Sequence, residues 1–458
     1  MSLAEIQSKT PAAQRIGQLE LVFNRLADAL LTELRADEQL KLTLQAEQSQ
    51  FVRFNAARVR QTGCITDGSL ALTLMQNQRN AYRSLPCTGD WETDWPQMQQ
   101  ALVELRQEVP DLPVDPYLVL PTGDATSRDI QTGQLLRPDL VAASLLPEVA
   151  GLDFTGIYAG GCVMRGYADS AGQRHWFATE SFALDYSLFT PDNQAVKGTF
   201  AGNQWDQAAY SAKLADSKLQ LQRLAQSPKS IPRGQYRTYL APSALAEIIG
   251  MFSWGGISEA ALQRGDSALA VLQRGEKQLS PCFSLSENFR HGLVPRFNEW
   301  GEVAPVELPL IAAGQLKNTL ISSRTAKEYG KVANGAAGGE YLRSPEVAPG
   351  KLASDQILAS LDTGLYLSNL HYLNWSDRPS GRITGMTRYA CFWVEQGELV
   401  APIENLRFDE SLYRCLGEAL LDLTETQEFV PEVGSYSNRS LGGIWVPGAL
   451  IEGFTYTL

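Results

Sequence analysis

The feature that most constrains the fold is an alternation of leucines directly after a helical pattern near the start of the chain. Apolar residues recur at three- and four-residue steps through 11–37, the spacing of one face of an α-helix. Leu40, Leu42 and Leu44 then alternate with polar residues, which is typical of a strand with one buried face. Strand-like runs at 51–60 and 69–76 follow. Together they predict an antiparallel meander behind the first helix.

The same patterns continue along the first half. Residues 93–109, 137–146 and 204–226 have helical spacing, and the first of these segments ends before Pro110. Two long strand-like stretches, 154–168 and 175–188, flank a turn at 169–172 that contains Asp, Ser and Gly. The second half is richer in glycine and begins with a strand at 235–240 and a helix near Pro242. We therefore expect an α+β fold in which antiparallel sheets predominate.

The chain is long enough to need more than one hydrophobic core. It has 458 residues, and single cores stop growing at about 250–300 residues. A polar segment with two prolines, 227–234, is the best candidate for a boundary. We expect an N-terminal domain of helices and antiparallel meander over 1–229, and a C-terminal domain rich in antiparallel sheet over 230–458.

Charge and hydropathy exclude some classes of function. The chain has 51 acidic and 39 basic residues, a net charge of -12, and no dense basic run. A nucleic-acid surface needs clustered Lys and Arg to displace counterions, so direct nucleic-acid binding is not expected. The polar start lacks the pattern of a signal peptide, and no stretch approaches the ~18 apolar residues of a membrane span. We expect a cytoplasmic protein with no membrane contact.

The cysteines and histidines show no ligand spacing. Six cysteines are scattered without a Cys-x-x-Cys pair, which argues against a disulfide framework or a zinc ribbon and favours reduced thiols. The three histidines are His175, His291 and His371. A Cys282–His291 pair with Glu287 as the acid, or with Ser284 or Ser286 in place of the thiol, remains an alternative for nucleophilic catalysis.

A set of ordered segments in the second half resembles the TldD/PmbA family. The segments that carry the resemblance are a strand with an Asn at 365–370, Thr-Gly-Met-Thr-Arg within 381–388, Glu-Gln-Gly-Glu within 391–398, and Pro-Ile-Glu-Asn-Leu-Arg-Phe at 402–408. Segments at 284–288, 295–301, 314–320 and 446–457 match in order, and 52–56 resembles a strand of the first half. Each segment alone could be an ordinary turn or strand, and only the ordered set carries the resemblance to the family.

The resemblance also shows what this chain lacks. The cutting subunit of the family carries a helical His-Glu-x-x-x-His and a late Cys, which ligate a zinc. Aligning Glu247 with the glutamate of that motif puts Ala246 and Met251 at the histidine positions and Val433 at the cysteine position. Neither Ala nor Val has a donor atom, and Met is no substitute for imidazole, whereas a peptidase zinc needs three protein ligands. We expect no metal, no cofactor and no catalytic residue in this chain.

The resemblance therefore implies a TldE/PmbA-type, metal-free member. Such a chain would pair with a zinc-bearing TldD-like homologue, or with itself, and help enclose and bind an unfolded, extended peptide. Motif position alone suggests Asn369, Thr384 and Arg388 as cleft residues. Two alternatives stay open: a stand-alone homodimeric peptide-binding protein, and a peptidase with a relocated active site. The family name also implies modulation of DNA gyrase, for which the acidic charge gives no direct support.

Overall fold

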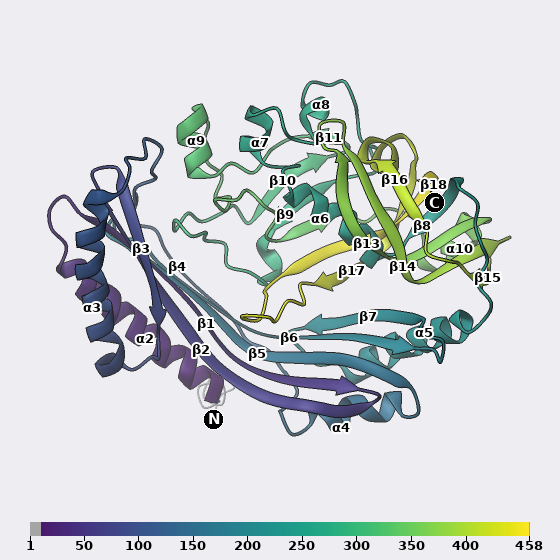
Figure 1. Cartoon of the computed structure of the whole chain (residues 1–458), viewed down its shortest axis with the longest axis horizontal. Helices are drawn as coiled ribbons and strands as arrows, with labels where there is room; N and C mark the ends of the chain where they lie inside the picture. The colour runs from purple at the N-terminus through teal and green to yellow at the C-terminus, as the bar shows by residue number, and fades with distance from the viewer. Residues whose placement is uncertain (1–10, 458) are drawn as a thin grey trace.

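The computed structural model describes residues 11–457, and its strands form two large sheets (Figure 1). The first sheet contains β1 (Gln39–Asn55), β2 (Arg58–Gln76), β3 (Arg79–Pro86), β4 (Thr126–Gln131), β5 (Asp153–Asp169), β6 (Arg174–Phe189) and β7 (Ala195–Gly202). Its main order is β3-β2-β1-β5-β6, all antiparallel, with β4 parallel to β6 and β7 antiparallel to it. The expected antiparallel meander is confirmed.

The second sheet holds the remaining strands. They are β8 (Gly234–Leu240), β9 (Leu285–Asn288), β10 (Glu307–Ala312), β11 (Gln315–Leu316), β12 (Pro345–Val347), β13 (Gly364–Asp377), β14 (Arg382–Glu395), β15 (Glu398–Pro402), β16 (Arg407–Ser411), β17 (Leu420–Pro431) and β18 (Gly443–Tyr456). Because β18 pairs with both β16 and β8, the strands β8, β13, β14, β16 and β18 close into a ring. Most pairings are antiparallel, as expected for an α+β chain.

Helices cover one face of the first sheet. They are α2 (Pro11–Thr32), α3 (Trp91–Glu108), α4 (Val141–Leu145) and α5 (Gln207–Leu224). Even-numbered side chains of β1 and β5, such as Leu42 and Met164, pack in the same core as α2 and α3. The far end of the sheet shares a second core with α4 and α5. Figure 1 shows α2 and α3 at one end of the long, curved sheet, on the side away from the second sheet.

The odd-numbered face of the first sheet meets the second half of the chain. Tyr167 and Phe177 pack with Phe297 in a small apolar cluster. The ammonium of Lys41 lies over the Trp300 ring and donates to the Glu299 carbonyl at 3.1 Å. Some polar residues of the leucine alternation thus contact the second half of the chain and others face solvent. Lys41 is buried, whereas Gln45 is exposed.

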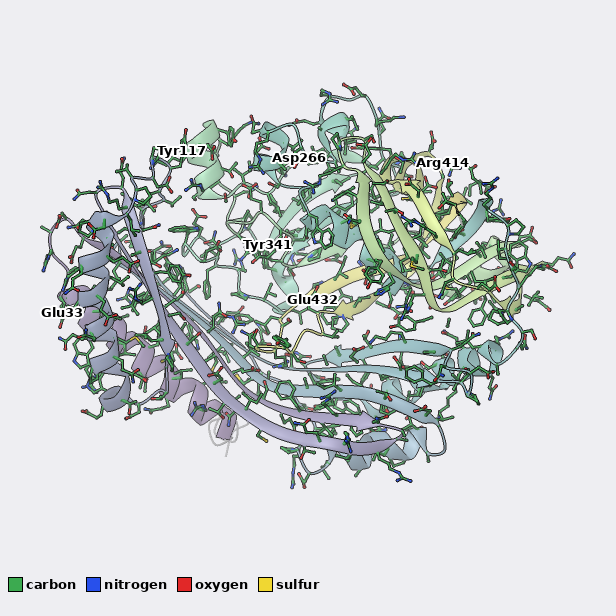
Figure 2. All side chains as sticks on the ribbon, viewed as in Figure 1. Glu33, Tyr117, Asp266, Tyr341, Arg414 and Glu432 are labelled. Carbon is green, nitrogen blue, oxygen red and sulfur yellow. The ribbon has the colours of Figure 1, made fainter. Side chains whose placement is uncertain are left out.

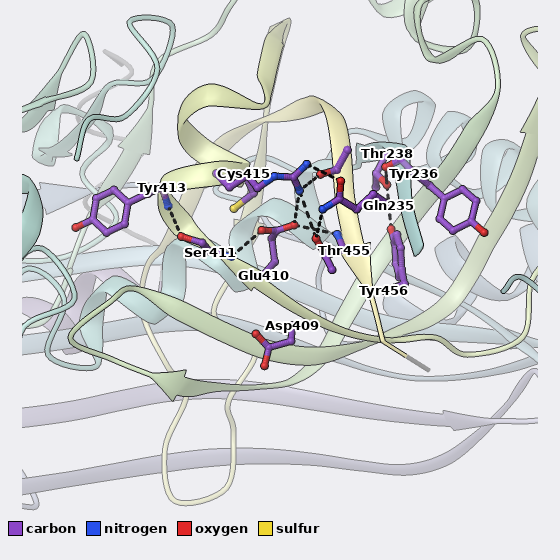
Figure 3. A network of polar contacts seen from close by, with 12 residues as sticks. Gln235, Tyr236, Thr238, Asp409, Glu410, Ser411, Tyr413, Cys415, Thr455 and Tyr456 are labelled. Carbon is purple, nitrogen blue, oxygen red and sulfur yellow. Dashed lines mark hydrogen bonds and ion pairs between the residues drawn. The ribbon is translucent and has the colours of Figure 1, made fainter. Parts of the chain in front are cut away.

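The second half contributes short helices and one polar network. The helices are α6 (Pro242–Gly250), α7 (Glu259–Gln263), α8 (Ala270–Gln273), α9 (Ser323–Tyr329) and α10 (Ile357–Leu361). In the network, Arg414 donates to Glu410 at 3.1 Å and to Gln235 at 3.2 Å, and the Glu410 carboxylate accepts the Thr455 N–H at 2.9 Å (Figure 3). These contacts join β8, β16 and β18 where the ring closes.

Two element predictions were wrong at their boundaries. The run 51–60 is not a separate strand, because β1 continues to Asn55 and the chain reverses at Ala56 and Ala57. Both alanines have positive φ, as in a type I′ turn, where Asn-Gly is the usual signal. The helix expected over 137–146 is α only at Val141–Leu145, since Pro147 follows.

Other features of the residues 11–457 bear on function. No helix there is both long and apolar enough to cross a membrane. All six cysteines are free thiols: Cys64 and Cys282 are exposed, and the other four are buried.

Candidate functional site

Helix α6 forms part of the wall of a cleft between the two sheets. It begins at Pro242, a favoured first-turn residue, after Ala241 in extended conformation. Its buried face, which includes Leu245 and Ile248, packs into the largest core of the second half. Ala246 lies half-buried on the cleft side of the helix. At this position the helix therefore offers the cleft only a methyl group.

The cleft has a volume of about 480 Å³ and receives residues from both halves of the chain. Apolar side chains form much of its lining, and the ionisable groups at its wall are few. Its lining residues are Arg165, Ala246, Ile249, Gly250, Ser253, Val294, Pro295, Tyr341, Leu342, Arg343, Pro345, Glu432, Ser440, Leu441, Gly443 and Ile444. Figure 2 shows Tyr341 and Glu432 in the middle of the molecule, between the two sheets. Small-molecule and peptide sites commonly have this size and composition.

Two carboxylates lie near each other here, and only that of Glu432 lines the cleft. Glu247 follows Ala246 on α6, and Glu432 lines the cleft from the loop between β17 and β18. Surrounding protein atoms and then the negative charge of Glu432 raise the pKa of Glu247 above its usual value. The Glu247 side chain keeps contact with solvent, so the cause is incomplete hydration rather than full burial.

The side chains at the family's metal positions do not fit a zinc ion. Met251 is 2% exposed and belongs to the hydrophobic core, so its thioether does not face the cleft. Val433 lies beside Glu432 and, like Ala246, has no donor atom. Within residues 11–457, no three His, Cys, Asp or Glu side chains group closely enough to hold a metal ion.

The three residues suggested by motif position lie outside this cleft. Asn369 lines another cavity, of about 440 Å³, near the start of α6, and Arg388 lines one of about 430 Å³ near Ile403. Asn369 and Arg388 are register partners on β13 and β14. Thr384 donates to the Phe408 carbonyl at 2.9 Å, a contact within the sheet. Their role in peptide binding stays a prediction.

The alternative nucleophilic site is not assembled. Cys282 is exposed, and within residues 11–457 no hydrogen bond joins its thiol to His291. His291 instead stacks on Trp445 and lies 3.4 Å from the Glu346 carboxylate. Glu287 is buried and accepts the backbone N–H groups of residues 343 and 344 at 2.7 and 2.6 Å, so it serves a loop rather than a histidine.

The remaining candidates also have structural partners. Ser284 Oγ accepts the Ala313 N–H at 3.0 Å, and Ser286 lies on β9 in register with β10 and β12. His175 is buried between Ser127, at 2.8 Å, and the Phe297 ring, and the His371 ring lies tilted against that of Tyr372.

Sequence reasoning missed two arginines, one on the odd-numbered face of the first sheet and one on a loop that contacts this face. Arg165 lines the cleft from β5, and Arg439 carries the loop after β17 onto the first sheet. A lone arginine inside the strand-like stretch 154–168 is a signal that a sequence analysis could use. Nothing in the local pattern marks Arg439, whose partners lie more than 250 residues away.

Comparisons with known proteins add the family. The sequence profile described as PmbA/TldA metallopeptidase C-terminal domain matches residues 233–457, which contain α6, Glu432 and all strands of the second sheet. Residues 233–457 of the chain belong to the TldD/PmbA family. A comparison with curated protein sequences found no match.

Solved structures of similar fold cover almost the whole chain. TldE from Thermococcus kodakarensis superposes with a TM-score of 0.78 at 14% sequence identity, covering 95% of this chain and 100% of that one. A candidate modulator of a DNA gyrase from Thermotoga maritima gives 0.74 at 15% identity, covering 96% and 100%. A third, from Bacteroides thetaiotaomicron and also described as a candidate modulator of DNA gyrase, gives 0.75 at 14%, covering 98% and 99%. At these identities the likeness shows that the fold is shared over both halves.

Proposed function

We propose that this TldD/PmbA-family chain is a non-catalytic, TldE-like subunit of a TldD/TldE-type metallopeptidase. One observation carries the proposal. Helix α6 borders the cleft between the two sheets as a metallopeptidase helix would, yet it presents Ala246 there, and Met251, directly after the helix, lies in the core. The cleft is kept while the ligands that the resemblance assigns to the cutting subunit are absent. A retained cleft without ligands suits binding rather than hydrolysis.

The ligand that suits this cleft is an unfolded peptide segment. The volume of about 480 Å³ is in the range of ligand sites, and the lining combines apolar side chains with a few charged groups. The cleft also borders the first residues of β12 and β18, so main-chain groups lie at its wall. An extended peptide can use main-chain hydrogen bonds for affinity and side-chain pockets for selectivity.

The gyrase names belong to the two structural relatives that carry them. This chain has a net charge of -12, which does not favour contact with DNA phosphates. We propose that any effect on a DNA-binding enzyme is indirect and passes through peptide maturation.

The test is reconstitution with the zinc-bearing, His-Glu-x-x-x-His homologue of the same genome. Hydrolysis of an unfolded casein substrate is measured for each chain alone and for the mixture. We expect the wild-type chain alone to be inactive and the mixture to be active. Ala246→Trp, which fills the cleft, should reduce the mixed activity at least about tenfold, because even a small misplacement of a bound substrate lowers the rate strongly. Ala209→Trp, at an exposed position on α5, should leave the activity unchanged.

Three results would contradict the proposal. Hydrolysis by this chain alone, lost on replacement of Cys282, would favour the relocated-site alternative. Full activity of the mixture with Ala246→Trp would show that the cleft takes no part. Peptide binding by a homodimer, with no association of the homologue, would leave the stand-alone binding protein as the function.

A further inference from the structure

Arg165 is held rigidly on the floor of the cleft. It lies in the middle of β5, opposite Gln45 of β1 and Phe177 of β6, so both neighbouring strands fix its backbone. Strand alternation places it on the same face as Tyr167, toward the second half of the chain. The next residue, Gly166, faces the other way, where an added Cβ would lie 3.0 Å from the Phe23 ring. The Arg165 side chain therefore points into the cleft, which it lines.

The guanidinium of Arg165 has few partners. Nη1 donates to the Met164 carbonyl at 2.9 Å, and within residues 11–457 no carboxylate lies within 4.0 Å of the group. The carboxylate that acts on its pKa is Glu47, which already accepts from the Ser49 hydroxyl and the Arg439 N–H. Burial lowers the pKa of Arg165 to about 10, with the charge of Glu47 opposing that shift and the charge of Arg439 adding to it. The group stays a cation at neutral pH, with unused N–H donors.

The other charged groups at the cleft are arranged differently. The Arg343 guanidinium donates to backbone carbonyls, including those of Phe297 at 3.1 Å and Gly335 at 2.8 Å. Glu432 is the carboxylate of the lining, and Glu247 of α6 lies near it outside the lining. Arg165 is thus a cation with free donors, facing a partly desolvated space where a charge-assisted hydrogen bond is strong. The planar fork of an arginine matches a carboxylate in two parallel bonds.

We propose that Arg165 binds a carboxylate of the peptide held in the cleft, and so selects for an acidic side chain or a free C-terminus. This inference rests on the proposed function and adds the class of substrate to it. Arg165 is a specificity-determining residue, and it takes no part in bond cleavage.

The experiment uses the full chain and three fluorescein-labelled, six-residue peptides of alanine and valine. One has a free C-terminal carboxylate, one is amidated, and one is amidated and contains a single glutamate. Fluorescence anisotropy gives the Kd of each for the wild type, Arg165→Gln, Arg165→Lys and Arg264→Gln, an exposed arginine outside the cleft. Circular dichroism melts check that each variant folds.

We expect the wild type to bind a carboxylate-bearing peptide about tenfold or more tighter than the plain amide, as a charge-assisted bond in such a site provides. Arg165→Gln should remove the preference, so that the carboxylate-bearing peptides bind no tighter than the plain amide. Arg165→Lys should keep part of it, and Arg264→Gln all of it. Tight binding of the free acid alone identifies the C-terminus as the source, and tight binding of the glutamate peptide identifies the side chain.

Two further results separate this inference from the proposed function. If acid and amide bind the wild type equally, and Ala246→Trp abolishes both, the cleft binds peptide but Arg165 does not select. If none of the three peptides binds, both the inference and the peptide-binding function are overturned. The wild-type comparison stands even where an Arg165 variant does not fold.

Discussion

Replacing Arg439 with alanine is expected to lower the free energy of unfolding by about 3 kcal/mol, the lower end of the range for removing one partner of a buried charged network. Arg439 is 5% exposed and lies between the two sheets. Its guanidinium donates to Ser181 Oγ and the Gly161 carbonyl, both at 2.8 Å, and more weakly to Ser49 at 3.3 Å. Glu47 is also buried here and keeps only the Arg439 backbone N–H and Ser49.

The alanine variant loses the side-chain bonds and the charge that faces Glu47, whereas the backbone N–H contact can survive. The partly buried Gly161 carbonyl and Ser181 hydroxyl then lose their donor, at about 1–3 kcal/mol for each group that stays unsatisfied. Water that enters the vacated space recovers part of this cost, which keeps the estimate at the lower end.

The assay is denaturant unfolding followed by tryptophan fluorescence and far-ultraviolet circular dichroism. Arg264→Ala, on an exposed loop, is the matched control and should change the free energy by less than about 0.5 kcal/mol. An Arg439→Ala protein within about 1 kcal/mol of the wild type, with an unchanged slope, would refute the reasoning that this arginine fastens the loop after β17 to the first sheet.

Three further predictions follow from other sites. Burial lowers the pKa of Lys41 to about 8 from its ordinary 10.5, so the folded state holds fewer protons than the unfolded state between these values. Stability of the wild type relative to Lys41→Met should therefore rise as the pH rises from about 8 to 10.5, measured as Tm against pH; a flat difference contradicts it. Glu287→Ala should cost about 2 kcal/mol in denaturant unfolding, because one buried and one partly buried N–H group lose their acceptor; an unchanged midpoint would show that water replaces the carboxylate. Cys282→Ala should leave both stability and the hydrolytic activity of the reconstituted pair unchanged, and a lost activity would revive the relocated-site alternative.

Local pattern predicted much of the first sheet and little of its turns. The leucine alternation locates β1, and the apolar stretches locate β5 and β6, because side-chain period and burial coincide there. The reversal at Ala56 and Ala57 was missed because alanine with positive φ carries no sequence signal. The contact of the odd-numbered face with the second half was missed for a different reason: a polar residue such as Lys41 reads as solvent-facing until its distant partner is known.

The candidate site was likewise predicted only in part from the sequence. The alignment of Glu247 gave the position of α6 and the missing ligands, and the structure brings Ala246 and Glu432 to one cleft. The alignment could not tell that Met251 is buried in the core, because whether a helical residue faces a core or a cleft depends on what packs against it. The position of Arg165 in the cleft could not be predicted without knowing that β5 pairs with β1 and β6. Asn369, Thr384 and Arg388 share a strand pair. Asn369 and Arg388 line different cavities and Thr384 bonds within the sheet, which a linear motif cannot separate.

The most direct test of the proposed role is affinity purification of this chain, at native level, from its own host, followed by mass spectrometry and metal analysis of the eluate. The account predicts co-elution of a zinc-bearing His-Glu-x-x-x-His homologue in near equal amount, with the zinc bound to that partner. A metal-free homodimer without such a companion, or zinc bound to this chain itself, would contradict it.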